Sequence, residues 1–263
     1  MEMKTRKSIL SVILLMLTLT TAFCMSVSAA SAKKKLVKSY KEYDATGKLT
    51  YEWTSTFNSK GDETGYSYAQ YKDGKVEYSG KVRYKLTYWK GSQYLKKSVT
   101  TGSDYSEIAT YNKKGHLKKV EYSSDGMKQT STYKNNGRSS VSVDQTGRVV
   151  SKSTYDGKGN MTLHTYYQPD GTSSTTRYTN SYYKDGTLKK RVINMDSRKV
   201  IINYDKNGIT IKRQEIENGK TTTTTFKNKY DKAGYVTKQT YYKDGQLMGS
   251  IVYKYTAKAY LVD

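Results

Sequence analysis

The chain has 263 residues, of which 46 are Lys or Arg and 23 are Asp or Glu, giving a formal net charge of +23 at pH 7. It carries one Cys, which excludes a disulfide framework, and its aromatic residues are 28 Tyr, 3 Phe and 2 Trp. High charge with few aliphatic residues is typical of disordered chains, but a tyrosine ring buries as much surface as a phenylalanine ring. Periodicity must therefore decide between disorder and a tyrosine-based core.

Residues 1–32 have the features of a secretory signal peptide. A basic start precedes an apolar run over residues 9–23, and small residues then offer cleavage after Ala29 or Ala32. The apolar run is shorter than the ~20 residues that span a bilayer, so we expect neither a membrane anchor nor a later transmembrane span. Cleavage would remove the single cysteine, so we expect a secreted or cell-envelope protein of bacterial type, exported without disulfides.

Residues 33–263 are expected to form one tyrosine-rich β-repeat domain. The repeated unit is a Tyr, two or three polar residues, a Gly, one further residue and often an aliphatic residue. Its spacing of about 11 residues per strand and turn indicates many short strands. The longer form of the unit occurs as Tyr43…Gly47…Leu49, Tyr111…Gly115…Leu117, Tyr155…Gly159…Met161 and Tyr230…Gly234…Val236.

The glycines predict two kinds of hairpin turn. In the shorter unit an Asp-Gly pair stands at residues 73–74, 185–186 and 244–245, which favours a two-residue type I′ turn. In the longer unit the Gly comes one residue later, as at residues 232–234, which suits a three-residue loop with Gly in the left-handed conformation.

These turn lengths predict a strand register. A loop at residues 185–186 pairs Tyr183 with Leu188, and a loop at residues 232–234 pairs Tyr230 with Val236. Both forms would place the repeat tyrosine opposite an aliphatic residue on one face of the sheet. Such aromatic–aliphatic pairs contribute roughly 0.2–1 kcal/mol each, so a long series of them favours an ordered sheet over disorder.

The predicted fold class is all-β, a long antiparallel meander of about seventeen short Tyr-rich strands in a single curled sheet or an open barrel-like roll. Strands of this length are shorter than the ~9–11 residues that cross a bilayer, and Lys and Asp recur densely. We therefore do not expect a transmembrane barrel. Sequence leaves open whether the sheet is open, rolled or a solenoid.

The repeat units resemble two kinds of known repeat. Tyr230–Lys238 and Tyr43–Thr50 resemble the tyrosine–aspartate repeats of bacterial Rhs-type proteins, and Tyr182–Lys190 is similar to the Tyr/Asp-Gly repeats of secreted bacterial β-repeat proteins. The first resemblance implies a β-sheet scaffold that encloses or displays another component, such as a toxin or effector. The chain departs from that family because many units lack the Asp and there is no room for a toxin domain.

Motifs for catalysis are missing from the sequence. His116 and His164 are the only histidines, and neither lies near a carboxylate or Cys at metal-ligand spacing. No Gly-x-Ser-x-Gly or His-Glu-x-x-His is present, and the Asp-Gly pairs are explained by turns. We expect no cofactor, no metal and no enzymatic activity. A glycan-active enzyme remains an alternative, because paired carboxylates meet in space rather than in sequence.

Lysines and doubled aromatic residues are the remaining functional signals. A net positive field concentrates anionic partners, and Lys189 and Lys190 belong to one of several lysine pairs. Successive strand residues face opposite ways, so doubled aromatics place one ring on each face of the sheet. The rings expected on the second face, away from the repeat tyrosines, are Trp89, Tyr166, Tyr182 and Tyr241.

Charge and rings together suggest a binding or structural module of the bacterial envelope. The expected ligand is an anionic polysaccharide or cell-wall polymer, bound by lysines and by stacking of rings on sugars. Export argues against nucleic acid as the main partner. The alternatives are an Rhs-like scaffold partner of a secreted toxin or effector and, less favoured, the glycan-active enzyme.

Overall fold

A computed structural model describes residues 32–262, so the expected signal peptide, apart from Ala32, lies outside the described residues. The described chain is built from antiparallel strands that follow one another in sequence. Their bounds are β1 (Ala32–Lys34), β2 (Val37–Asp44), β3 (Leu49–Phe57), β4 (Glu63–Lys72), β5 (Lys75–Tyr88), β6 (Leu95–Thr101), β7 (Tyr105–Tyr111), β8 (Leu117–Ser124), β9 (Met127–Lys134), β10 (Ser139–Asp144), β11 (Val149–Tyr155), β12 (Met161–Tyr167), β13 (Ser173–Tyr182), β14 (Leu188–Asn194), β15 (Arg198–Tyr204), β16 (Thr210–Glu217), β17 (Lys220–Tyr230), β18 (Val236–Lys243), β19 (Gln246–Tyr255) and β20 (Tyr260–Val262).

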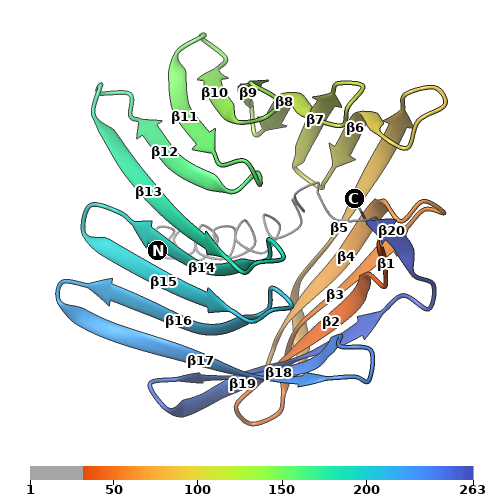
Figure 1. The fold of residues 1–263 in the computed structure, drawn as a ribbon, viewed down its shortest axis with the longest axis vertical. Helices are drawn as coiled ribbons and strands as arrows, with labels where there is room; N and C mark the ends of the chain where they lie inside the picture. Colours follow the sequence, from red (N-terminus) through yellow and green to blue (C-terminus); the bar gives the residue numbers. More distant parts are fainter. Residues whose placement is uncertain (1–31, 263) are drawn as a thin grey trace.

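Strands β2 to β19 form a closed barrel in which each strand pairs with its sequence neighbours and β19 pairs with β2. Figure 1 shows these strands in sequence order around a ring, with β1 and β20 side by side at one rim. The predicted all-β antiparallel meander is therefore confirmed, and the sheet is closed rather than open. Some strands are longer than expected, since β5 has 14 residues and β17 has 11.

Closure of the barrel is reinforced beyond the last strand pair. The Thr256 backbone N–H donates to the Leu36 carbonyl (2.8 Å), and the Leu36 N–H donates to Thr256 Oγ1 (3.0 Å). Thr256 is buried, so these bonds are shielded from water. They join the segment before β2 to the segment after β19, which holds the two ends of the domain together.

Most three-residue turns share one hydrogen-bonded pattern. At residues 231–235 the Asp231 carboxylate accepts from the N–H groups of Ala233 and Tyr235, and Gly234 takes a φ of 84°. A side-chain oxygen that bonds two residues onward stabilises such a turn, and Gly adopts positive φ without a Cβ clash. The predicted pairing of Tyr230 with Val236 is confirmed.

The two-residue turns are confirmed at two of the three predicted sites. Asp73–Gly74 and Asp244–Gly245 both have positive φ at each residue, as a type I′ turn requires. The prediction for Asp185–Gly186 is wrong. The Tyr183 N–H bonds the Thr187 carbonyl (2.8 Å), and Tyr182 rather than Tyr183 pairs with Leu188.

The cause of this error is the doubled tyrosine. Gly186 lies four residues after Tyr182 and three after Tyr183, so the segment fits both turn lengths. The structure takes the three-residue loop, in which the Asp185 carboxylate accepts from the Thr187 N–H (2.9 Å) and Gly186 has a φ of 90°. Tyr182 therefore takes the position opposite the aliphatic residue that the sequence predicts for Tyr183.

The barrel wall has two chemically different faces. Directly paired residues share a face and side chains alternate along each strand, so the registers assign every strand residue to one of them. Apart from Gly65, which has no side chain, the buried strand residues lie on one face. We call it the inner face, because side chains converge on the concave side of a closed sheet. Its rings include Tyr40, Tyr51, Trp53, Tyr66, Tyr68, Tyr84, Tyr105, Tyr122, Tyr178, Tyr182, Tyr204, Tyr241 and Tyr253.

The prediction that all repeat tyrosines share one face is also wrong. Tyr155 and Tyr230 lie on the inner face, whereas Tyr43 and Tyr242 lie on the outer face. Each of these tyrosines stands beside a shift in register, where one strand carries an extra residue. One extra residue reverses the alternation of side chains along a strand. The repeat tyrosine therefore faces the inside of the barrel at some turns and the outside at others.

Candidate functional site

The outer face of the barrel is rich in lysine. Its acids in the described strands are Glu52, Glu77 and Glu121, so basic residues far outnumber them. Such a surface concentrates anions near it. The basic side chains on this face are Lys41, Lys81, Arg83, Lys85, Lys97, Lys119, Lys128, Lys134, Lys152, Arg177, Lys190, Lys199, Lys212, Lys227, Lys229, Lys238 and Lys254.

Four exposed lysines lie close together on the outer face of β17, β18 and β19: Lys227, Lys229, Lys238 and Lys254, which we call the lysine patch. Lys229 and Lys238 are directly paired across the strands. Like charges in this position are destabilising, so the pair is unfavourable for the sheet alone. Between residues 32 and 262, none of the four takes part in an ion pair.

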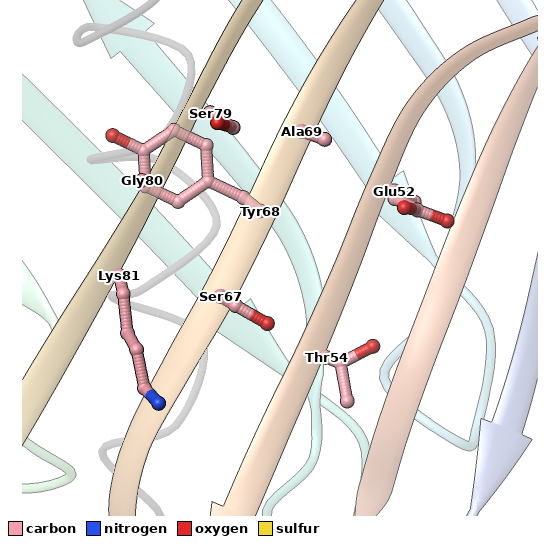
Figure 2. A pocket seen from close by; sticks show the side chains of 8 residues that line it. All are labelled: Glu52, Thr54, Ser67, Tyr68, Ala69, Ser79, Gly80 and Lys81. Carbon is pink, nitrogen blue, oxygen red and sulfur yellow. The ribbon is translucent and has the colours of Figure 1, made fainter. Parts of the chain in front are cut away.

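A shallow depression of about 530 Å³ lies on β3, β4 and β5. Figure 2 shows Glu52 and Lys81 toward opposite ends, with the small side chains of Thr54 and Ser67 between them. The Glu52 carboxylate is already engaged by Lys41 (3.2 Å) and by the Tyr71 hydroxyl (2.7 Å). The depression thus offers small polar side chains but no second acid that would pair with Glu52 for acid–base chemistry.

The inner face of β2 to β8 carries a nearly continuous belt of rings. Trp53 stacks on Tyr40 at 5.4 Å between centroids and also contacts Tyr66 at 5.9 Å. Tyr66 in turn contacts Tyr84 at 6.2 Å. Offset and tilted pairs at such distances are favourable beyond the area they bury. Most of these rings are half-buried rather than sealed, so the belt keeps a surface toward the barrel interior.

Charges on the inner face are segregated around the ring. Glu42, Glu63 and Glu107 stand among the tyrosines of the belt, and burial raises the pKa of each carboxyl. Arg198 and Arg213 lie on β15 and β16, where both pair with Glu215. The inner face therefore offers two environments, one rich in rings and carboxylates and one rich in guanidinium groups.

The structure does not bring the predicted binding rings and lysines onto one surface. Tyr166, Tyr182 and Tyr241 lie on the inner face, so the predicted separation of these rings from the core face is wrong. Trp89 lies in the turn between β5 and β6, where its Nε1–H donates to the Asn112 carbonyl (3.1 Å). An extra residue at a turn reverses the alternation of side chains, which explains why these rings lie on the face opposite to the predicted one.

The two predicted lysines also separate. Lys190 lies on the outer face opposite Asn203. Lys189, the preceding residue at the start of β14, points to the inner face, and its Nζ is 5.7 Å from the centre of the Tyr183 ring. Tyr182 is engaged within the protein, because its hydroxyl donates to the Asp156 carboxylate. Only Lys190 of the predicted set therefore lies on the lysine-rich outer face.

Sequence reasoning missed the ring belt of the inner face. Its signal is visible as alternation with a period of two, as in Tyr51-Glu52-Trp53 and Tyr66-Ser67-Tyr68, which is typical of one strand face. The repeat tyrosines beside the turns do not follow this alternation, so they obscure it in the sequence. Glu42 and Glu107 gave no sequence signal, because isolated acids on strands are ordinary.

Comparisons with known proteins leave the family open. No protein family and no curated protein matches the sequence. Among solved structures, the chain is similar to a porin-like protein from Bacteroides uniformis (12% identity, TM-score 0.49, covering 84% of this chain and 96% of that chain) and to one from Bacteroides vulgatus (11%, 0.31, 85% and 100%). It is also similar to a TcdB2–TccC3–Cdc42 structure (12%, 0.30), of which it matches 15% while 80% of this chain is covered. These likenesses are too weak to carry a functional argument, and the Rhs resemblance stays a prediction.

No group of three or more His, Cys, Asp and Glu side chains within residues 32–262 could hold a metal ion. No helix in the described part of the chain is long and apolar enough to cross a membrane.

Proposed function

We propose that the protein is a non-enzymatic binding protein of the bacterial envelope that holds an anionic wall or surface polymer on its lysine-rich outer face. The observation that carries the proposal is the lysine patch. Four exposed lysines on three adjacent strands have no acidic partner among the described residues, and Lys229 directly faces Lys238. An anionic chain laid across the strands would relieve this repulsion.

The spacing of the strands supports an extended ligand. Neighbouring strands lie ~4.8 Å apart, so a polymer running across the sheet meets a new strand at each such step. Lys97 and Lys119 share one cross-strand row through Thr110, which separates them by about two strand spacings. Repeated positive charges along such rows suit repeated negative charges on a polymer.

The ring-stacking part of the sequence hypothesis does not extend to this surface. Tyr166, Tyr182 and Tyr241 face inward, away from the lysine patch. Binding on the outer face then depends on charge. We expect it to be salt-sensitive, because the Debye length falls from ~10 Å at 0.1 M to ~3 Å at 1 M ionic strength.

Paired lysine variants test this proposal. Changing Lys229 and Lys238 to Gln should weaken binding to purified teichoic acid or polyphosphate roughly tenfold or more at low salt, because each lysine near an anionic surface contributes on the order of 1 kcal/mol. Lys72 and Lys75 are a matched control, since they also face each other across two strands and are exposed. Their double Gln variant should bind nearly normally in the same equilibrium binding assay.

Two results would contradict the proposal. Equal losses in both double variants would mean that only net charge matters and that the lysine patch is no site. Undiminished binding at 1 M salt would show that charge does not carry the interaction at all.

A further inference from the structure

Glu42 occupies an unusual position on the inner face at the closure of the barrel. On β2 it is paired with Tyr51 of β3 on one side and with Ile251 of β19 on the other. Tyr40 lies two residues before Glu42 and Tyr253 two residues after Ile251, and these two tyrosines are themselves a directly facing pair. Closure of the sheet thus brings three tyrosines from three strands around one carboxylate.

The rings around Glu42 are in mutual contact. The Tyr40 ring is 5.7 Å from the Tyr51 ring and 6.1 Å from the Tyr253 ring, and Trp53 stacks on Tyr40 at 5.4 Å. All four rings are half-buried, so they form a wall with an accessible side. Trp53 and Tyr51 stack on Tyr40, so the wall offers a ligand the ring edges and those ring faces that no neighbouring ring covers.

A fourth tyrosine reaches the same place across a glycine. Tyr241 of β18 is paired with Gly249 of β19, and a Cβ on Gly249 would stand 2.8 Å from the Tyr241 hydroxyl oxygen. The missing side chain lets the Tyr241 ring lie over β19 toward β2. Burial, followed by the negative charge of Glu42, raises the pKa of Tyr241.

The carboxylate of Glu42 has no compensating partner in the described chain. No ion pair or side-chain hydrogen bond to it is present among residues 32–262, although the protein has twice as many basic as acidic residues. Glu42 is half-buried, so its charged form loses part of its hydration at a cost in free energy, and this burial raises the pKa of the carboxyl. A cationic ligand would remove that cost.

We propose that Glu42, together with Tyr40, Tyr51, Tyr241 and Tyr253, forms a binding site for an organic ammonium cation. Rings attract a cation through their negative faces, and the central carboxylate supplies a full opposite charge. A metal ion is disfavoured because a single carboxylate among rings lacks the several oxygen ligands that Ca²⁺ or Mg²⁺ requires. A quaternary ammonium group matches both the rings and the charge.

The site is tested with choline and its uncharged isostere 3,3-dimethylbutanol. Trp53 stacks on Tyr40, so its fluorescence reports occupancy once Trp89, the other tryptophan, is changed to Phe. Choline should change the Trp53 emission in a saturable way at pH 8, whereas equal concentrations of NaCl should not. The isostere should bind at least about tenfold more weakly, because it keeps the shape and loses the charge.

Charge at residue 42 is the decisive variable. Glu42→Gln should weaken choline binding by about tenfold or more while preserving the fold, as checked by circular dichroism. Glu121→Gln is the matched control, since Glu121 is an outer-face strand acid paired with Lys119 (2.7 Å), and it should bind choline normally. Equal binding of choline and 3,3-dimethylbutanol, unchanged affinity in Glu42→Gln, or no saturable response to choline would overturn the proposal.

Discussion

Changing Tyr40 to Ala is expected to lower the free energy of unfolding by about 3 kcal/mol. Truncation of a buried aromatic residue costs roughly 3–5 kcal/mol, and a half-buried ring falls near the low end of that range. Tyr40 is in contact with Tyr51, Trp53 and Tyr253, so its removal leaves a gap among three other rings. The lost ring contacts also belong to β2, the strand at which the barrel closes.

Tyr166 provides the matched comparison on the same face. It is 47% exposed, and no ring contact to it is present among the described residues. Tyr166→Ala should therefore change stability by no more than about 0.5–1 kcal/mol, as most surface substitutions do. Urea unfolding of both variants, followed by circular dichroism, gives the two values. Similar losses in both would mean that the ring belt does not hold the inner face together.

Gly249→Ala is expected to destabilise the protein by about 1–3 kcal/mol or more, the usual cost of forcing extra atoms into a packed site. A Cβ at residue 249 would lie 2.2 Å from the Tyr43 carbonyl oxygen and 2.8 Å from the Tyr241 hydroxyl. The first contact is with backbone, so β19 must move away from β2. The substitution thus opposes closure of the barrel directly.

A second glycine separates this steric effect from a general glycine effect. At Gly157 the nearest atom to an added Cβ is Arg138 Nη2 at 3.7 Å, and this glycine does not have a positive φ. Gly157→Ala should therefore stay within about 0.5 kcal/mol of the parent protein in the same urea titration. A Gly249→Ala variant as stable as Gly157→Ala would show that β19 and β2 are not closely paired.

The local features of the fold were predictable from sequence because they depend on nearby residues. Turn composition and loop length gave the register of Tyr230 with Val236, and the regular spacing gave the antiparallel meander. The error at Tyr182 and Tyr183 has a physical origin of the same local kind. Two adjacent tyrosines fit two turn lengths, and only the hydrogen bonds of the folded turn distinguish them.

The faces of the wall and the site near Glu42 could not be predicted in this way. One extra residue at a turn reverses the alternation of side chains, so a small error there exchanges inside and outside. Glu42 meets Tyr241 and Tyr253 only because β18 and β19 close onto β2 after the whole meander has turned around. No local pattern records such a long-range contact.

In the closed barrel, residues of opposite alternation along a strand face the inside and the outside. Thr175 and Thr176 are adjacent on β13, both half-buried, and paired with Thr165 on the outer face and His164 on the inner face. In a chain carrying Cys24→Ser, the variants Thr175→Cys and Thr176→Cys should both react with free N-ethylmaleimide. Only Thr175→Cys should be captured by a maleimide fixed to beads, which cannot enter the barrel. Capture of both variants at equal rates would contradict the closed barrel with its separate inner and outer faces.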